Sequence, residues 1–273
     1  MLEYSLPGCL AAALLLVSCQ DQSTDPATPS TDSPTRSELF AAHELDHIRG
    51  SHNAEDHQVS YVVDAVEDRY TLTLTLDDQK TLTAVADYDQ FHTELNGHQH
   101  ELTATEALAL NTTAIKLAEA LYTGTNEEAL RTTLAENTLI RLMDWFSYIP
   151  PGYRLGKEVV ADSELQKSRN NDGVTCVKKN RYYTISWDDS RGNRSARDKA
   201  GRNRGGNYNC MARCGAGCGR WWIPSSWTLD CFEHDECSRQ NNSSGGASDS
   251  NCGDEWIHAS DDWTFGVIRG CSG

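Results

Sequence analysis

The stretch CGAGCGRWWIPSSWTLDCFEHDEC, residues 214–237, contains four cysteines, three glycines and the pair His234-Asp235. Small exported domains are commonly held together by disulfides that have no catalytic role. The stretch therefore allows two hypotheses: a disulfide knot that only stabilises itself, or an active site that uses the knot as a scaffold.

The second half of the stretch, LDCFEHDEC, predicts a helix whose histidine is held by disulfides. At 100° per residue, Cys231 and Cys237 lie three residues on either side of His234 and project within about 60° of it. Two disulfides there would fix the imidazole, as suits a general base that must meet a water molecule in one geometry. Asp235 points about 100° away, so it is available to a different partner.

The first half, CGAGCG at residues 214–219, predicts a tightly bent loop. Glycine tolerates positive φ, so the backbone can turn and direct carbonyl oxygens inward. Carbonyl oxygens and a bidentate carboxylate are ligands that Ca²⁺ takes. The loop therefore has the donor chemistry of a calcium site.

The arrangement resembles secreted phospholipase A2, whose calcium loop reads Y-x-C-x-C-G-x-G-G and whose active-site helix reads D-x-C-C-x-x-H-D-x-C. The corresponding segments here are NCMARCGAGCG at 209–219 and LDCFEHDEC at 229–237. They are also similar to a group of bacterial exported proteins with a CGAGC…DC..HD.C core, for which a phospholipase-like domain is inferred. The resemblance covers roughly residues 176–271 and leaves residues 38 to about 165 outside it.

The resemblance implies a role for each matching residue. His234 would be the general base that deprotonates water, and Asp235 would bind Ca²⁺ through both carboxylate oxygens. The ion would polarise the ester carbonyl and stabilise the oxyanion. Its other ligands would be the carbonyl oxygens of Arg213, Gly215 and Gly217. The implied reaction is calcium-dependent hydrolysis of the sn-2 acyl ester of glycerophospholipids. The alternative is a non-catalytic, disulfide-stabilised surface binding or structural module with the same fold.

A second carboxylate is implied on a later helix, where it would hold the far nitrogen of the imidazole and fix its tautomer. In the family this residue directly follows a cysteine. Here Gly253 separates Asp254 from Cys252, and Asp261 shares the face of Asp254 two helical turns further on. Both aspartates are therefore candidates for the role.

Three positions depart from the family pattern. Asp230 stands in place of the first of two adjacent cysteines before the histidine, and Cys218-Gly219 stands in place of a Gly-Gly. Ser238 occupies the position at which the family often has a tyrosine that braces the dyad. These changes do not remove the groups that the implied reaction uses, which are His234, Asp235 and the loop carbonyl oxygens.

Ten cysteines are present, and eight of them fall in the last hundred residues. An even number in one region of an exported chain predicts about four disulfides, and eight cysteines allow 105 pairings. An iron–sulfur or zinc cluster is the alternative, and it would need a reducing compartment. The resemblance implies the pairs Cys214–Cys231 and Cys237–Cys252. The pairing of the other four stays open: Cys176, Cys210, Cys218 and Cys271.

The N-terminus predicts export. The apolar run Leu10–Val17 is too short to span a bilayer and is placed like the hydrophobic region of a signal sequence. It ends in LVSC, which looks like a bacterial lipobox with Cys19 as the lipidated residue, although the preceding segment has no Lys or Arg. Residues 20–37 are rich in Ser, Thr, Pro and Asp, as is typical of a disordered tether. We expect a lipoprotein of the bacterial outer membrane or cell surface, or otherwise a secreted protein.

The formal charge of −16 is unevenly distributed. Acidic residues dominate before residue 170, whereas residues 178–220 contain eleven Lys or Arg against three Asp. This asymmetry indicates a second domain with a cationic face, or alternatively a solvated basic loop. Four apolar side chains adjoin the basic segment: Trp221, Trp222, Ile223 and Trp227. They would suit an anionic phospholipid membrane surface, unless they form the core of a small domain, and the acidic whole argues against nucleic acid as a partner.

Residues 38–165 predict an accessory domain of antiparallel strands and two helices. In YTLTLTL, residues 70–76, leucines alternate with threonines, the period-2 pattern of a half-buried strand. Asn96-Gly97 predicts a two-residue hairpin, and RYYTISW at 181–187 predicts one more hairpin strand after the accessory domain. The expected fold class is α+β, with a disulfide-rich, mainly α, phospholipase A2-like domain at 171–273.

The two helices of the accessory domain are predicted from their caps. Thr103 with Glu106 forms a capping box for a helix that runs to about Tyr122. A second helix is expected to start at Asn126 and to stop before Pro150. Its apolar face is formed by Leu130, Leu134, Leu139, Leu142 and Trp145.

The segment HELDH, residues 43–47, matches the H-E-x-x-H signature of zinc proteases, in which two histidines one helical turn apart bind the metal. Three features weaken this alternative. The segment directly follows the tether, Asp46 puts a charge where such helices usually carry a small or apolar residue, and His52 is one residue short of the spacing for a third ligand. The zinc-protease hypothesis requires a helix here and a catalytic role for Glu44.

Overall fold

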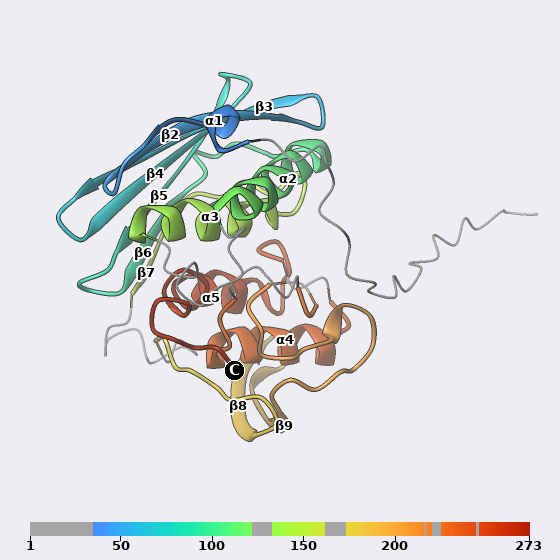
Figure 1. Ribbon diagram of the computed structural model, residues 1–273. Coiled ribbons are helices and arrows are strands. Elements are labelled where there is room, and N and C mark those ends of the chain that lie inside the picture. The colour runs from blue at the N-terminus through green and yellow to red at the C-terminus, as the bar shows by residue number, and fades with distance from the viewer. Residues whose placement is uncertain (1–34, 122–132, 162–172, 216, 220–224, 244–245) are drawn as a thin grey trace, which may run out of the picture. The chain divides into compact units, whose positions relative to one another are not determined.

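The N-terminal half of the chain forms an antiparallel sheet of seven strands that follow one another in chain order (Figure 1). The strands are β1 (Phe40–His43), β2 (His47–Ala54), β3 (His57–Val66), β4 (Arg69–Leu76), β5 (Lys80–Asp87), β6 (His92–Asn96) and β7 (Lys157–Ala161). In β4, Tyr70 and the three leucines are buried and the threonines between them are less buried. The alternation expected for this segment is confirmed.

The computed structural model describes residues 35–121, 133–161, 173–215, 217–219, 225–243 and 246–273, and these belong to one compact unit. The signal sequence and Cys19 lie outside the described residues, as does most of the predicted tether. A short helix, α1 (Arg36–Leu39), begins within the last residues assigned to that tether.

Two helices, α2 (Ala104–Leu121) and α3 (Leu134–Ser147), cover one face of the sheet (Figure 1). The backbone N–H of Thr103 donates to Glu106 Oε2 at 2.7 Å, which confirms the predicted capping box. A second capping box joins Thr133 and Glu136 at the start of α3. The start predicted at Asn126 lies outside the described residues, and the described helix begins at Leu134.

The hairpin predicted at Asn96-Gly97 is wrong. β6 ends at Asn96 and pairs with the distant strand β7. A Cβ on Gly97 would lie 2.7 Å from the carbonyl oxygen of Leu155, so this glycine permits a close approach to the segment before β7. The positive φ angles of the turn belong instead to His98 (50°) and Gln99 (60°).

The zinc-protease helix is also wrong. His43 ends β1, His47 begins β2, and the residues between them connect the two strands. His43 Nε2 lies 2.8 Å from Glu136 Oε1, whereas His47 Nδ1 lies 2.7 Å from Asp64 Oδ1. Because β2 pairs along its whole length with β3, sheet pairing has overridden the helical spacing of the motif.

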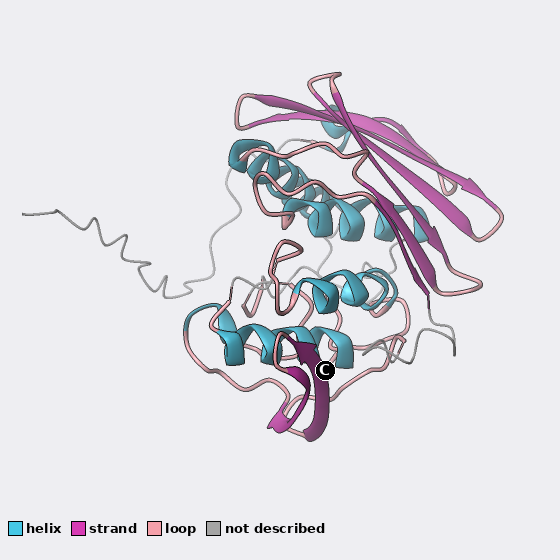
Figure 2. Cartoon of the chain, turned by 180° about the vertical axis from the view of Figure 1, so that it is seen from behind, coloured by secondary structure: helices cyan, strands magenta, loops and turns pink. Residues whose placement is uncertain are grey.

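The C-terminal region is built on two helices and a hairpin (Figure 2). Its elements are β8 (Tyr182–Asp189), β9 (Gly192–Lys199), the short 3₁₀ helix η2 (Gly206–Tyr208), α4 (Leu229–Asn241) and α5 (Gly253–Phe265). β8 confirms the strand expected at RYYTISW. Two buried glutamates dock the hairpin, since the backbone N–H of Ser186 donates to Glu233 at 2.7 Å and that of Asp188 donates to Glu255 at 3.0 Å.

Four disulfides link this region, and two of them are the pairs implied by the resemblance, Cys214–Cys231 and Cys237–Cys252. The other two are Cys176–Cys271 and Cys210–Cys218. Such a set is typical of an extracellular or exported protein. None of the described helices combines the length and apolarity that crossing a membrane requires.

The larger of two hydrophobic clusters among the described residues contains side chains of both halves, and the second lies within the C-terminal region. The sheet and the helices together have the expected α+β layout. Phe265 at the end of α5 packs edge-on against Tyr88 and Phe91, with ring centroids 5.1 and 5.6 Å apart. The side-chain amide of Asn137 on α3 donates to the carbonyl of Thr264 at 2.8 Å. Helix α5 therefore lies between the sheet's helices and α4.

Candidate functional site

A pocket of about 250 Å³ opens over one face of α4. The helix directs His234, Asp235 and Ser238 into it, and the loop at 213–215 forms a neighbouring wall. Helix α5 contributes Trp256 and Trp263, and the C-terminal cap of α3 contributes Tyr148. The pocket is smaller than a typical ligand cavity, but it has the mixed apolar and polar lining of a small-molecule site.

Two disulfides fix the helix that carries His234. Cys231, three residues before the histidine, is joined to Cys214 of the loop, and Cys237, three residues after it, is joined to Cys252 at the start of α5. The helix is therefore tied to the loop on one side and to α5 on the other. The spacing of the cysteines predicted two disulfides beside His234, and the resemblance implied their partners Cys214 and Cys252.

The imidazole of His234 keeps about a fifth of its surface exposed, as a group that must reach a water or a substrate requires. Its Nε2 lies 3.4 Å from the hydroxyl of Ser238, one helical turn further on. Its Nδ1 lies 3.9 Å from Asp235 Oδ1. The serine that replaces the family's tyrosine is thus itself next to the ring.

The two carboxylates implied as partners of the imidazole do not line the pocket. Helix α5 turns Trp256, Ala259 and Trp263 toward it, and at 100° per residue Asp254 and Asp261 fall on the opposite face. Asp254 is exposed and groups with Asp188 and Glu255, and Asp261 is fully buried with Asp230 and Asp262. The helical phase of α5 separates both from the pocket lining.

Asp235 is half-buried on α4, next to the loop. It accepts a hydrogen bond from the backbone N–H of Ala212 at 2.8 Å. Burial raises its pKa to about 8, against the opposing effects of this hydrogen bond and of Arg213. A carboxylate in such surroundings favours a cation beside it.

The loop has the backbone conformation that its glycines predict. Gly215, Gly217 and Gly219 have φ angles of 108°, 54° and 60°. A carboxylate next to a glycine loop offers the hard oxygen donors that Ca²⁺ takes, so the residue types present fit the implied ion, although the carbonyl oxygen of Gly217 accepts from Arg213 Nη1 at 3.5 Å.

Several pocket residues were missed by reasoning from sequence. The side chain of Arg213 is buried within the loop, although only its carbonyl was predicted to matter. Tyr208 donates from its hydroxyl to the carbonyls of Ser238 and Ser243, at 3.2 and 3.0 Å. Tyr208 directly precedes the loop segment 209–219, and this adjacency could have found it. Tyr148 carries no local signal, because it reaches the pocket through tertiary packing.

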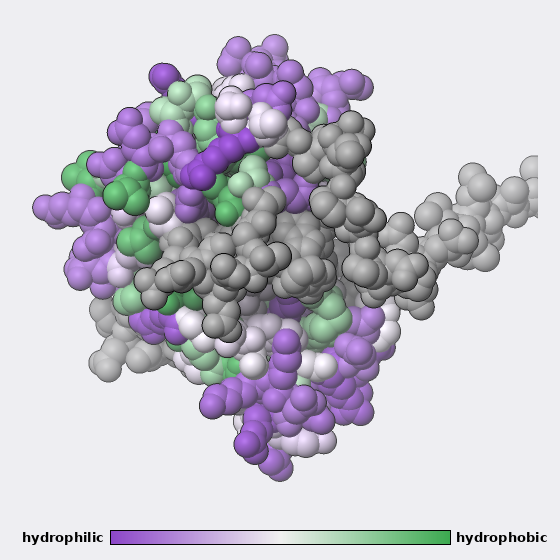
Figure 3. Space-filling model, in the orientation of Figure 1, coloured by the Kyte–Doolittle hydropathy of each residue, from purple (hydrophilic) through white to green (hydrophobic). Residues whose placement is uncertain are grey.

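The proposed membrane-facing aromatics are only partly described. Trp221, Trp222 and Ile223 lie outside the described residues. Trp227 is buried in the core, with the ammonium of Lys179 4.4 Å from its ring centre, so it is a core residue and not a surface anchor. The basic segment contains the β8–β9 hairpin, and Arg194 is exposed on β9. Figure 3 shows hydrophilic residues gathered over this hairpin.

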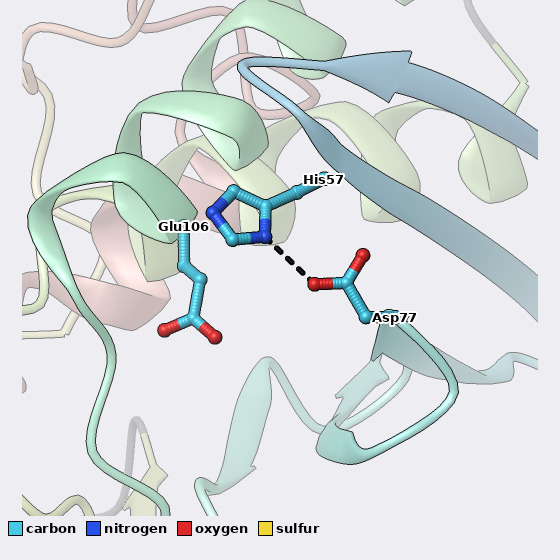
Figure 4. Close-up of side chains that lie close together, drawn as sticks. All are labelled: His57, Asp77 and Glu106. Carbon is cyan, nitrogen blue, oxygen red and sulfur yellow. Dashed lines mark hydrogen bonds and ion pairs between the residues drawn. The ribbon is translucent and has the colours of Figure 1, made fainter.

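A second group of titratable side chains, His57, Asp77 and Glu106, lies at the edge of the sheet (Figure 4). His57 Nδ1 lies 2.7 Å from Asp77 Oδ2, and this hydrogen bond lowers the pKa of Asp77. Glu106 accepts from Lys80 at 2.8 Å and from the capping N–H of Thr103. These contacts join the sheet to the start of α2, so a structural role explains why the three side chains lie together.

Comparison with known proteins adds one match. A family model described as a domain of unknown function, DUF8213, matches residues 172–273, which is the disulfide-rich region that contains the pocket helix and loop. No curated protein and no solved structure shows a significant match to the chain.

Proposed function

We propose that this chain is a calcium-dependent hydrolase of the sn-2 acyl ester of glycerophospholipids. The observation that carries the proposal is one pocket in which His234 and Asp235 project from a disulfide-locked helix beside a glycine loop. A general base and a cation site in one small, partly apolar pocket are the parts that hydrolysis of an acyl ester needs.

His234 is the general base of the proposed reaction. The oxygen of a water molecule bonds to the ester carbonyl carbon while His234 takes the water's proton. The imidazolium then gives this proton to the glycerol oxygen as the ester C–O bond breaks, leaving a fatty acid and a lysophospholipid. Ser238, 3.4 Å from Nε2, orients the ring.

Four residues would hold calcium: Asp235 through its carboxylate, and Arg213, Gly215 and Gly217 through their carbonyl oxygens. Bound there, the ion would supply positive charge for the ester oxygen as negative charge develops on it. The half-buried carboxylate of Asp235, with its raised pKa, supports a cation at this position.

The proposed site of action is a phospholipid surface outside the cytoplasm. The disulfides support export, and the exposed basic hairpin supports an anionic membrane as the partner. Lipidation at Cys19 would hold the protein next to this substrate.

One observation favours a different class of function, a non-catalytic binding module. Neither Asp254 nor Asp261, the two carboxylates that the family resemblance implied, is among the residues that line the pocket. A module that kept the fold and lost turnover would retain the disulfides, the loop and Asp235.

The test is fatty-acid release from mixed phosphatidylglycerol and phosphatidylethanolamine vesicles by the oxidised exported chain, with Ca²⁺ or with EGTA. We expect release that requires Ca²⁺ and that His234→Asn abolishes, because asparagine cannot accept the proton. His258→Asn is a matched control on α5, outside the pocket lining, and should retain activity. No release by folded, calcium-loaded protein would contradict the proposal and favour the binding module.

A further inference from the structure

The side chain of Arg213 folds back into the loop that its own backbone helps to form. The residue is 9% exposed, and its Nη1 lies 3.5 Å from the carbonyl oxygen of Gly217. A Cβ on Gly219 would overlap the guanidinium, and a Cβ on Gly215 would lie 3.3 Å from Nη1. The glycines of the loop therefore make room for a guanidinium as well as for the bend.

Two carboxylates from different parts of the chain attract the guanidinium, Asp235 on α4 and Asp144 on α3. Asp144 is held in place by the indole N–H of Trp263, which donates to its Oδ2 at 3.2 Å, and by Arg141, whose Nη1 lies 3.8 Å from the same oxygen. Of these two carboxylates, Asp235 lines the pocket, and Asp144 lies behind the pocket residue Trp263, to which it is hydrogen-bonded.

Arg213 keeps its charge at neutral pH. Burial, and then repulsion from Arg141, lowers its pKa to about 10, which still leaves the side chain protonated. The described part of the loop therefore contains a fixed positive charge next to Asp235, in the region where the proposed function places Ca²⁺.

We propose that the guanidinium of Arg213 is the loop's own cation, and that Ca²⁺ binds Asp235 and the loop carbonyls only by displacing it toward Asp144. The inference rests on the proposed calcium site. Gly217 supplies the same carbonyl oxygen to the guanidinium and to the proposed ion, so the two positive charges would lie against one oxygen atom. Their like charges also repel at this separation.

The displaced side chain has a place to go. Asp144 already attracts Arg213, and Arg213 itself lines the pocket, whose volume of about 250 Å³ can take the guanidinium. Arg213 then sets the calcium affinity of the site, and α3 takes part in calcium binding although it supplies no ligand. This gives the sheet-bearing half of the chain a role in the site.

The test is calorimetric titration of Ca²⁺ into the oxidised exported chain and into Arg213→Met, which keeps the length of the side chain and removes its charge. We expect Arg213→Met to bind Ca²⁺ at least tenfold more tightly, and Arg213→Lys to bind like the wild type. Arg194→Met, which removes an exposed arginine of β9, is the matched control and should leave the affinity unchanged. Asp235→Asn should abolish binding in both backgrounds.

A double-mutant cycle with Asp144 tests the displacement itself. Asp144→Asn should weaken Ca²⁺ binding severalfold in the wild type, because the displaced guanidinium loses its partner. The same substitution should leave the affinity of Arg213→Met unchanged. An equal effect of Asp144→Asn in both backgrounds would overturn the displacement.

The outcomes separate this inference from the proposed function. Equal affinities of wild type and Arg213→Met would overturn the inference and leave the calcium site intact. No calcium binding by either protein would overturn the calcium site and the inference together. If Arg213→Met does not fold, the comparison of Asp144→Asn with wild type decides: an unchanged affinity would overturn the displacement.

Discussion

The indole of Trp145 on α3 stacks on the indole of Trp256 on α5, with ring centroids 4.0 Å apart and planes inclined by 27°. Trp145 is fully buried, and Trp256 also lines the pocket. The contact therefore joins the sheet-bearing half of the chain directly to a wall of the proposed active site.

Trp145→Ala should destabilise both halves together. Replacing a fully buried tryptophan by alanine costs about 3–5 kcal/mol. The indole N–H of Trp145 has no hydrogen-bond partner among the described residues, so the loss is one of packing. Chemical denaturation followed by tryptophan fluorescence and by near-ultraviolet circular dichroism should show one transition at lower denaturant. Leu108→Ala, on an exposed position of α2, is the control; two separate transitions would contradict a shared core.

Tyr148→Ala should widen the pocket at its α3 wall and change the acyl-chain preference of the proposed hydrolase. The pocket has room for roughly ten carbon atoms, given that a 150 Å³ cavity binds benzene. Removing the ring should raise the rate on sixteen-carbon relative to eight-carbon acyl chains by about tenfold. Tyr182→Ala, which removes an exposed tyrosine of β8, should not change this ratio. An unchanged ratio in Tyr148→Ala would show that the acyl chain does not reach α3.

Asp262→Asn should stabilise the protein at neutral pH. Burial, and then the neighbouring Asp261, raises the pKa of Asp262 well above its ordinary value. The folded state therefore keeps a proton that the unfolded state has lost, so the free energy of unfolding falls as pH rises above about 4. Asparagine does not titrate, so it removes this loss of stability with pH. Its side-chain oxygen can still accept the 3.2 Å hydrogen bond from the N–H of Asp230.

The measurement for Asp262→Asn is the free energy of unfolding between pH 4 and pH 8. The free energy of unfolding of Asp262→Asn should exceed that of the wild type by an amount that grows as pH rises. The control is Asp56→Asn, in an exposed turn where asparagine tolerates the positive φ, and the difference between its free energy of unfolding and that of the wild type should not change with pH. A gap that does not grow with pH would show that Asp262 has an ordinary titration.

Glu44→Gln should leave fatty-acid release unchanged. Glu44 lies in the exposed connection between β1 and β2 and not on a helix beside two metal-binding histidines. Activity of the variant within twofold of the wild type is the expected result. Loss of fatty-acid release in Glu44→Gln would contradict this expectation. It would require a role for the β1–β2 connection that the fold does not explain.

The parts of the site that lie close in sequence were predictable. Cysteine spacing around His234 and the glycines of the loop act through local geometry, so they predicted the helix and the bend, whereas the partners in two of the disulfides were implied by the family resemblance. The half-buried strand at 70–76 and the capping box at Thr103 were predictable for the same reason.

The parts that depend on tertiary packing were not predictable from local patterns. Asn96-Gly97 has the composition of a hairpin turn, yet Gly97 serves a close approach to Leu155 from another part of the chain. The HELDH segment has helical spacing, yet pairing with β3 makes it strand and connection. The placement of Asp254 depended on the phase of α5, which one inserted residue after Cys252 is enough to rotate by about 100°.

The most direct test of the central claim uses phosphatidylglycerol that carries a ¹³C-labelled acyl chain at the sn-2 position alone. The oxidised exported chain with Ca²⁺ should release labelled fatty acid and leave the unlabelled chain on a lysophospholipid, whereas His234→Asn should release neither. Release of the unlabelled chain, or equal release by wild type and His234→Asn, would contradict the account.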